Sequence, residues 1–363
     1  MKIGVFGGSF NPVHQQHLRI AKAAMVRQQL DQVWLIPVFE PVHKSGRDLL
    51  DYDQRRALLE LAIGEDHAFR ICDAEKDLGG ASYTVRTMRH LQQEYRQHQF
   101  FLIIGGDSLA DLYTWRKIDE LVEMVEFIVV ERPGYKKQSP IEQARLRWVD
   151  CELSDVSSSQ IREELRSEKF SEFELLAPPV FYRILRENLY GAAGSLYAEV
   201  LNKLNEYLFE LPEGLQAHIE GVAFHAFQLA LGAEESPLRA LVAGLAHDIF
   251  RIAPAENILH WVRQAGYDLD EIEKQTPMLA HGAAAAGLLQ FEFPGIDAEL
   301  LDALRWHTLP EPGLSLLGKI LVIADTLEPS RKIARREELR TAQIPLDDKF
   351  ARVLQLKRES VKE

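Results

Sequence analysis

The stretch GVFGGSFNPVHQQHL, residues 4–18, indicates the fold of the first half of the chain. Residues 2–6 form a short apolar run typical of a buried strand, Gly7 and Gly8 predict a tight turn, and residues 17–30 have the apolar spacing of a helix. Glycines at such a turn let backbone N–H groups approach a phosphate, and the positive end of the helix dipole points to the same place. The stretch therefore predicts a strand, a phosphate-binding turn and a helix.

Strand-like and helix-like segments alternate through the rest of the first half. The expected strands are residues 32–38, 69–74, 100–104 and 127–130, and the expected helices are residues 53–63, 84–95 and 180–189. Strands that are apolar on both faces predict a parallel sheet covered by helices on both sides. The fold class expected here is a Rossmann-like, doubly wound α/β sheet. Such sheets bind ligands at the carboxyl ends of their strands, where the glycines after Phe6 and Ile104 lie.

The strand signal nearly disappears after the small, flexible stretch Gly191-Ala-Ala-Gly194. Helical periodicity follows in residues 196–210, 215–231, 237–249, 255–265, 279–290, 297–306 and 314–327. We therefore expect two domains, an α/β domain in residues 1–191 and an all-α domain in residues 192–363. The charged end of the chain reads as a solvated helix or a frayed tail.

Composition limits the function classes. Among the 363 residues, 42 are Lys or Arg and 55 are Asp or Glu, so the net charge is −13, and the pI is near 5.5. This balance argues against nucleic-acid binding by bulk charge. Two cysteines, Cys72 and Cys151, form no disulfide framework, which favours a reducing, cytoplasmic location. The first residues do not read as a signal peptide, and no apolar run is long enough for a membrane span. A homo-oligomer is compatible with the sequence.

Two histidines lie at the entrance of the first expected helix. His14 and His17 are three residues apart, so both can face one pocket. A reaction that builds negative charge at phosphorus would use such donors. The alternative, from these residues alone, is a tight turn with two capping histidines.

Seven ordered motifs in roughly residues 1–190 resemble those of the bacterial nicotinate-nucleotide adenylyltransferases, an HxGH nucleotidyltransferase family. The resembling stretches are VHQQH at 13–17, PVHK at 41–44, RRALLELAI at 55–63, SYT at 82–84, IGGD at 104–107, RPG at 132–134 and VSSSQIR at 156–162. Gln16 stands where the HxGH signature has glycine. Another HxGH transferase, such as one for pantetheine phosphate, is the alternative, which SYT, the position of Trp115 and VSSSQIR disfavour.

The resemblance implies transfer of AMP from ATP to nicotinate mononucleotide, giving deamido-NAD and pyrophosphate, with Mg²⁺ on the triphosphate. It implies that the catalytic residues are His14, His17 and Lys44. The implied ATP-binding residues are Gly7, Gly8, Ser9, Phe10, His17, Gly105, Asp107, Arg132, Ser158, Ser159, Ile161 and Arg162. The implied nicotinate-nucleotide-binding residues are Lys44, Thr84 and Trp115. Each also has a plainer alternative: Lys44 suits a solvated loop, Ser158 a helix N-cap and Trp115 a core.

Six residues of the second half carry a different chemistry. Each lies in or beside a mostly apolar helical run, so burial, and hence pairing or metal ligation, is expected. They are His218, His247, Asp248, His281, His307 and Asp325. Histidine and aspartate ligands suit divalent iron, manganese, cobalt or zinc. Taken singly, each histidine also suits a structural role.

The order of these residues, with the stretches AHD, HGAAAAG, LRWHT and IADTLEP, resembles an HD-domain phosphohydrolase, and more closely the symmetrical bis(5′-nucleosyl)-tetraphosphatases. The resemblance implies one metal on His218, His247, Asp248 and Asp325, a second on His281 and His307, and Asp248 as a bridging and catalytic residue. Di-iron is the expected centre, with manganese or cobalt as alternatives. The implied substrate is diadenosine tetraphosphate, cut to two ADP by water whose pKa the cation lowers. A regulatory, non-hydrolytic domain and a hydrolase for another nucleotide are the alternatives.

Overall fold

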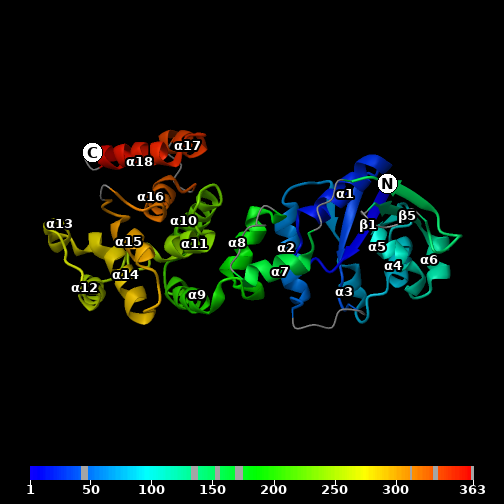
Figure 1. Ribbon diagram of the computed structural model, residues 1–363, viewed down its shortest axis with the longest axis horizontal. Coiled ribbons are helices and arrows are strands. Elements are labelled where there is room, and N and C mark those ends of the chain that lie inside the picture. Colours follow the sequence, from blue (N-terminus) through cyan, green and yellow to red (C-terminus); the bar gives the residue numbers. More distant parts are fainter. Residues whose placement is uncertain are drawn as a thin grey trace. The chain divides into compact units, whose positions relative to one another are not determined.

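The computed structural model describes residues 1–41, 48–131, 138–151, 156–167, 175–310, 313–329 and 334–360. It divides into two compact units, Met1–Ile184 and Leu185–Glu363. The first unit contains a parallel sheet with helices, and the described part of the second unit is helical (Figure 1). The predicted α/β fold followed by an all-α domain is therefore confirmed. No helix within the described ranges is both long and apolar enough to span a bilayer.

The sheet of the first unit has six strands in the order β3-β2-β1-β4-β5-β6, and all neighbouring pairs are parallel. The strands are β1 (Lys2–Gly8), β2 (Gln32–Pro37), β3 (Phe69–Ile71), β4 (Gln99–Gly105), β5 (Glu126–Val130) and β6 (Leu146–Val149). In the register of the sheet, Val5 of β1 lies between Trp34 of β2 and Leu102 of β4. Because the strand order reverses between β1 and β4, their carboxyl ends flank the crevice in which such sheets bind ligands.

Helices cover both faces of this sheet. The helical elements of this part of the chain are α1 (Gln15–Gln28), α2 (Tyr52–Ile63), α3 (Ala74–Leu78), α4 (Thr84–Glu94), α5 (Gly106–Ala110), η1 (Leu112–Thr114), α6 (Ile118–Met124), α7 (Ser158–Arg166) and α8 (Pro178–Arg186), and the last of these continues into the second unit. Side chains alternate between the faces of a strand. Val5 and its neighbours on one face form a core with Met88 of α4 and Leu121 of α6. Gly4 faces the other side, where a Cβ would lie 2.7 Å from Leu30, just after α1.

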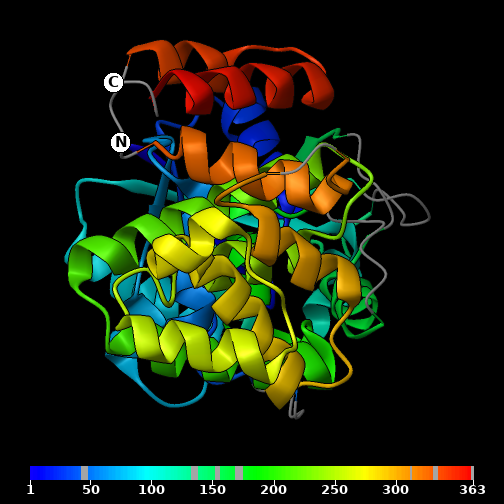
Figure 2. The same cartoon turned by 90° about the vertical axis from the view of Figure 1, so that its left-hand side faces the viewer.

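The second unit is built from helices packed around α16. Its elements are η3 (Leu189–Gly191), α9 (Gly194–Phe209), α10 (Glu213–Leu231), α11 (Pro237–Ala246), α12 (Ala255–Gln264), α13 (Glu271–Gln275), η4 (Pro277–Ala280), α14 (His281–Glu292), α15 (Ala298–Trp306), α16 (Leu316–Leu327), α17 (Ala334–Thr341) and α18 (Leu346–Ser360). Helices α10 and α11 approach closely because Gly244 has no Cβ, which would lie 2.4 Å from Cα of Ala223. The red helices α17 and α18 lie along the orange α16 (Figure 2).

Candidate active sites

The turn after β1 is shaped by one aromatic ring. Phe10 is fully buried and has a φ of 45°, in the left-handed region that residues with a Cβ seldom adopt. A Cβ on Gly8 would lie 3.1 Å from this ring. The ring also packs edge-on against the imidazole of His17, with 5.1 Å between the centroids. The second glycine and Phe10 therefore fix the path of the turn and support His17.

The two histidines lie together at the start of α1. His14 is the N-cap residue, and its ring centroid lies 3.8 Å from that of His17. Nδ1 of His17 accepts a hydrogen bond from the backbone N–H of His14, at 3.2 Å. In a neutral ring this bond places the proton on Nε2, which is then a donor. His17 thus has the capping role that the plainer alternative expected, and its Nε2 remains the donor that phosphate chemistry requires. Gln16 is buried beside them.

The N-terminal part of helix α7 contacts the turn after β1. The hydroxyl of Ser158 donates to the carbonyl of Pro12 at 3.1 Å. The guanidinium of Arg162 donates to the carbonyl of Asn11 at 2.7 Å and to Oγ of Ser159 at 3.2 Å. These bonds place the N-terminus of α7 and a positive charge beside the turn that carries His14, so a helix dipole adds to the anion-attracting groups.

A cavity of about 150 Å³ lies at the carboxyl ends of β1 and β4. Thr84 and Trp115, the residues expected to bind the nicotinate nucleotide, both line it, as do Gly7 and Gly105. Asp107 lies in the first turn of the adjoining α5. Ile161 is buried, and Ser9 offers its backbone carbonyl to Arg55. Lys44 and Arg132 lie outside the described residues, so their roles stay predictions.

The sequence-based prediction did not include Glu75, which also lines this cavity. Its carboxylate accepts from the backbone N–H of Phe39 at 3.1 Å and from the hydroxyl of Thr87 at 3.2 Å. Burial raises the pKa of Glu75 above its ordinary value. The hydroxyl of Ser82 accepts from the backbone N–H of Phe39 as well, at 3.1 Å. Glu75 and Ser82 therefore hold the segment after β2 beside the cavity. In the sequence, the helical run AEKDL of α3 did not indicate that its glutamate is buried.

Arg55 ties three segments around the crevice together. It is 1 % exposed and donates to the carbonyls of Leu50, Ser9 and Val38 at 3.0, 2.9 and 2.7 Å.

We expect the Arg55→Met change to lower the free energy of unfolding by ~3 kcal/mol, because these buried carbonyls lose a charged donor. Thermal unfolding of the full chain measures this. The exposed Arg19→Met is the matched control and should unfold as the wild type does; equal unfolding temperatures for the two variants would contradict the prediction.

In the second unit the six predicted residues come together. They lie on α10 (His218), after α11 (His247 and Asp248), at the start of α14 (His281), after α15 (His307) and on α16 (Asp325). All six side chains are buried. Their donor atoms form two groups within which all atoms lie no more than 4.8 Å apart: His218, His247 and Asp325 in one, and Asp248, His281 and His307 in the other.

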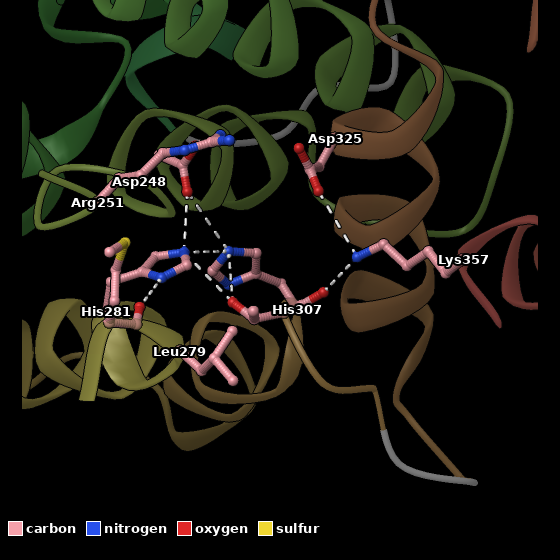
Figure 3. A pocket seen from close by; sticks show the side chains of 9 residues that line it. Asp248, Arg251, Leu279, His281, His307, Asp325 and Lys357 are labelled. Atoms are coloured by element: carbon pink, nitrogen blue, oxygen red, sulfur yellow. Dashed lines mark hydrogen bonds and ion pairs between the residues drawn. The ribbon is translucent and has the colours of Figure 1, made fainter. Parts of the chain in front are cut away.

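Asp248 lies between the two groups. Its Oδ2 is 3.5 Å from Nε2 of His218 and 3.4 Å from Nε2 of His247. Its Oδ1 is 2.9 Å from Nε2 of His281 and 3.7 Å from Nε2 of His307 (Figure 3). One carboxylate oxygen therefore faces each group, which is the geometry that a bridging ligand requires.

The rings are oriented by bonds at their other nitrogen. Nδ1 of His247, His281 and His307 each lies 2.7 Å from a backbone carbonyl three residues earlier in the chain. A carbonyl only accepts, so Nδ1 carries a proton, and in a neutral ring Nε2 then presents its lone pair to the cluster. For His218 the partner is a side chain: Nδ1 lies 3.5 Å from Oε2 of Glu328. The stretch IADTLEP contains Glu328, but the pattern alone gave it no role.

These donor atoms fit divalent metal ions. Nε2 of His281 and Nε2 of His307 lie 3.2 Å apart, although both present lone pairs. Two acceptors at this distance repel unless a proton or a cation lies between them. Nε2 of His247 is buried and, in the part of the chain that the structure describes, has no hydrogen-bond partner. Nitrogen and carboxylate donors of this kind are those that iron, manganese, cobalt and zinc bind.

The electrostatics of the cluster favour ionised aspartates and a neutral His307. Burial alone would raise the pKa of Asp248, but His247, His218 and His281 hold it well below its ordinary value. Burial likewise opposes ionisation of Asp325, and His218 and Lys357 lower its pKa. Burial lowers the pKa of His307 to about 4. Ionised carboxylates and neutral imidazoles are the forms that ligate metals.

Gly282 allows α14 and α15 to bring His281 and His307 together. A Cβ at this position would lie 2.4 Å from the carbonyl oxygen of Leu304 and 2.7 Å from the ring of His307. We expect Gly282→Ala to displace His307, reduce the metal bound per chain and lower the free energy of unfolding by about 2 kcal/mol. The control is Gly214→Ala, because a Cβ there meets no atom within 4 Å. Thermal unfolding and elemental analysis test this; wild-type metal content in the Gly282→Ala protein would contradict it.

Comparison with known proteins divides the chain in the same way. Residues 5–164 match the cytidylyltransferase-like family model, and residues 215–330 match the HD-domain model. A probable nicotinate-nucleotide adenylyltransferase of Shouchella clausii is 40% identical over 190 residues, which are 52% of this chain and 97% of that protein. The nicotinate-nucleotide adenylyltransferase of Bacillus subtilis is 37% identical over 187 residues, 52% of this chain and 96% of that protein.

Two solved structures are similar to different halves. A Plasmodium falciparum nicotinic acid mononucleotide adenylyltransferase complexed with NaAD is 21% identical, with a TM-score of 0.46, over 52% of this chain and 97% of that one. A predicted HD superfamily hydrolase involved in NAD metabolism from Clostridium acetobutylicum is 32% identical, with a TM-score of 0.40, over 44% of this chain and 85% of that one.

Proposed function

Because this chain belongs, over its first half, to the nicotinate-nucleotide adenylyltransferase family, we propose that its first unit transfers AMP from ATP to nicotinate mononucleotide. A phosphate oxygen of the mononucleotide attacks the α-phosphorus of ATP, the bond between the α- and β-phosphates breaks, and pyrophosphate leaves. The dinucleotide product is deamido-NAD. Mg²⁺ bound with ATP would neutralise part of the charge on the departing phosphates.

The observation that carries this proposal is the pair of histidines at the glycine turn, beside a cavity at the switch point of the sheet. Nε2 of His17 is a donor because Nδ1 accepts from His14. A donor held in this way stabilises charge on the phosphates without reorganising during the reaction. Thr84 and Trp115 on the wall of the cavity suit a carboxylate and a pyridine ring. Lys44 is proposed to bind a phosphate group together with His14 and His17.

The test offers ATP to the full chain with nicotinate mononucleotide, nicotinamide mononucleotide or pantetheine phosphate, and follows pyrophosphate release. We expect the nicotinate nucleotide to be the preferred acceptor. Turnover of pantetheine phosphate alone would reject the assignment and favour a different HxGH transferase.

We further propose that the second unit hydrolyses a nucleotide phosphoanhydride, with diadenosine tetraphosphate cut to two ADP as the favoured substrate. The six buried donors support this, since Asp248 offers one oxygen to each of two groups of ligands. Divalent metal ions held there would lower the pKa of water and polarise phosphate oxygens. The bonds at Nδ1 fix the orientation of three of the imidazoles, so that Nε2 of each faces the cluster.

A regulatory nucleotide-binding module is the competing function for the second unit. ADP release from diadenosine tetraphosphate separates the two, measured before chelation, after chelation and after Fe²⁺, Mn²⁺ or Co²⁺ is returned. We expect hydrolysis that a chelator abolishes and a metal restores. A metal-loaded protein that binds nucleotides without releasing any product would favour the regulatory function. Release from another nucleoside polyphosphate alone would change the substrate but keep the chemistry.

A further inference from the structure

Lys357 of the C-terminal helix α18 reaches the metal-ligand cluster of the second unit. It lies outside residues 215–330, which match the HD-domain model. Helix α18 is held on α16 by an apolar core that includes Phe350 and Val353 of α18 and Val322 of α16. One turn beyond Val353, Nζ of Lys357 donates to the carbonyl of His307 at 2.9 Å and lies 3.6 Å from Oδ2 of Asp325 (Figure 3).

The cavity beside the cluster, of about 240 Å³, has a cation on each of two sides. Arg251 lies beside Asp248, with 2.6 Å between Nη1 and Oδ2. Lys357 lies beside Asp325, with 3.6 Å between Nζ and Oδ2. The imidazoles of His281 and His307 line the same cavity (Figure 3). Both cations belong to the wall of the cavity.

Cations at these positions do not favour metal binding. A positive charge near a carboxylate that ligates a divalent ion repels that ion, because the interaction of like charges strengthens as water is excluded. An anion that enters the cavity, in contrast, would be attracted by the bound metal ions and by the positive charges of Arg251 and Lys357. An ammonium is a compact charge with three N–H donors, which suits the oxygens of a phosphate.

We propose that Lys357 binds a phosphate group of the nucleoside polyphosphate that the second unit acts on. This inference rests on the proposed hydrolase function of that unit. It makes Lys357, in the charged segment that the sequence pattern left as a solvated helix or a frayed tail, a part of the substrate site. The competing explanation is structural: Lys357 would only fasten α18 to His307 and Asp325.

The test compares the full-length wild type with Lys357→Gln, Lys357→Arg and the control Arg358→Gln, which removes the same charge from the exposed neighbouring residue. The amide of glutamine keeps an N–H donor for the carbonyl of His307 but has no charge. Each protein is loaded with Mn²⁺, and inorganic phosphate is titrated while the electron paramagnetic resonance of the bound Mn²⁺ is recorded. This signal reports phosphate binding without any turnover, and elemental analysis gives the Mn²⁺ per chain.

We expect Lys357→Gln to weaken phosphate binding by at least ~10-fold, as the loss of a charge-assisted hydrogen bond does. Its Mn²⁺ content and unfolding temperature should match the wild type, Lys357→Arg should recover most of the affinity, and Arg358→Gln should not change it. The KM for diadenosine tetraphosphate should rise more than kcat falls. Equal phosphate affinity in all four proteins, or a loss of Mn²⁺ in Lys357→Gln, would overturn the proposal.

The two proposals can fail separately. If no nucleoside polyphosphate is hydrolysed but Lys357→Gln still weakens phosphate binding, the hydrolase function fails and the anion contact stands. If hydrolysis occurs and the phosphate affinity of Lys357→Gln equals that of the wild type, only the role of Lys357 fails.

Discussion

The Asp248→Asn protein should release ADP from diadenosine tetraphosphate more than ~100-fold more slowly than the wild type, with fewer metal ions bound per chain. Changing a residue that only orients a metal ligand costs 10–100-fold in many sites, so loss of a shared ligand should cost more. Asp248 faces His218 and His247 with one oxygen and His281 with the other. Asparagine would replace one of these oxygens with an N–H donor.

Transfer of AMP in the same preparation should continue at the wild-type rate, because Asp248 belongs to the second unit. The control is Asp302→Asn, a change of the same chemistry at an exposed position of α15. ADP release and metal content are measured on both variants. If Asp248→Asn hydrolysed the substrate at the wild-type rate, the cluster would have no role in the reaction. If Asp248→Asn and Asp302→Asn lost ADP release and metal equally, the losses would be a general effect of the substitution.

The His17→Ala protein should show the opposite pattern. Removal of a donor that is aimed at developing charge lowers kcat by ~100- to 1,000-fold in comparable sites. We therefore expect adenylyl transfer to fall by this factor while ADP release from diadenosine tetraphosphate is unchanged. Pyrophosphate release at saturating ATP and nicotinate mononucleotide measures the change.

Alanine at position 17 also removes the acceptor for the backbone N–H of His14. The His17→Asn protein separates this structural loss from the chemical one, since its amide oxygen can accept that bond. Transfer should be slow in both variants, whereas His67→Ala, on the exposed surface of the same unit, should be as active as the wild type. Rapid transfer by His17→Asn would limit His17 to a capping role.

The sequence was sufficient to predict the order of the two domains because the signals were local and strong. Apolar runs identified five of the strands, and buried histidines among apolar helical residues identified the cluster of the second unit. The strand β6 was missed: Leu146–Val149 lies at the edge of the sheet, carries Arg147, and buries only Val149, so it lacks an apolar run. Edge strands of this kind resemble surface loops in sequence.

Residues that act through tertiary contacts could not be predicted from spacing. Glu328 orients His218, yet in the sequence it is one more glutamate after an apolar helix. Lys357 lies in a charged segment, and only the packing of Phe350 and Val353 on α16 brings it to the cluster. Glu75 is buried by the cavity that it helps to form. Such residues can be identified only from the folded structure, in which the packing of the helices brings them to the site.

The most direct test of the account is anomalous scattering from crystals of the metal-loaded full chain, recorded at the absorption edges of iron, manganese and cobalt. We expect two peaks, one at the group of His218, His247 and Asp325 and one at the group of Asp248, His281 and His307. Metal-loaded crystals with no peak at either group, or with ions bound only elsewhere on the chain, would contradict it.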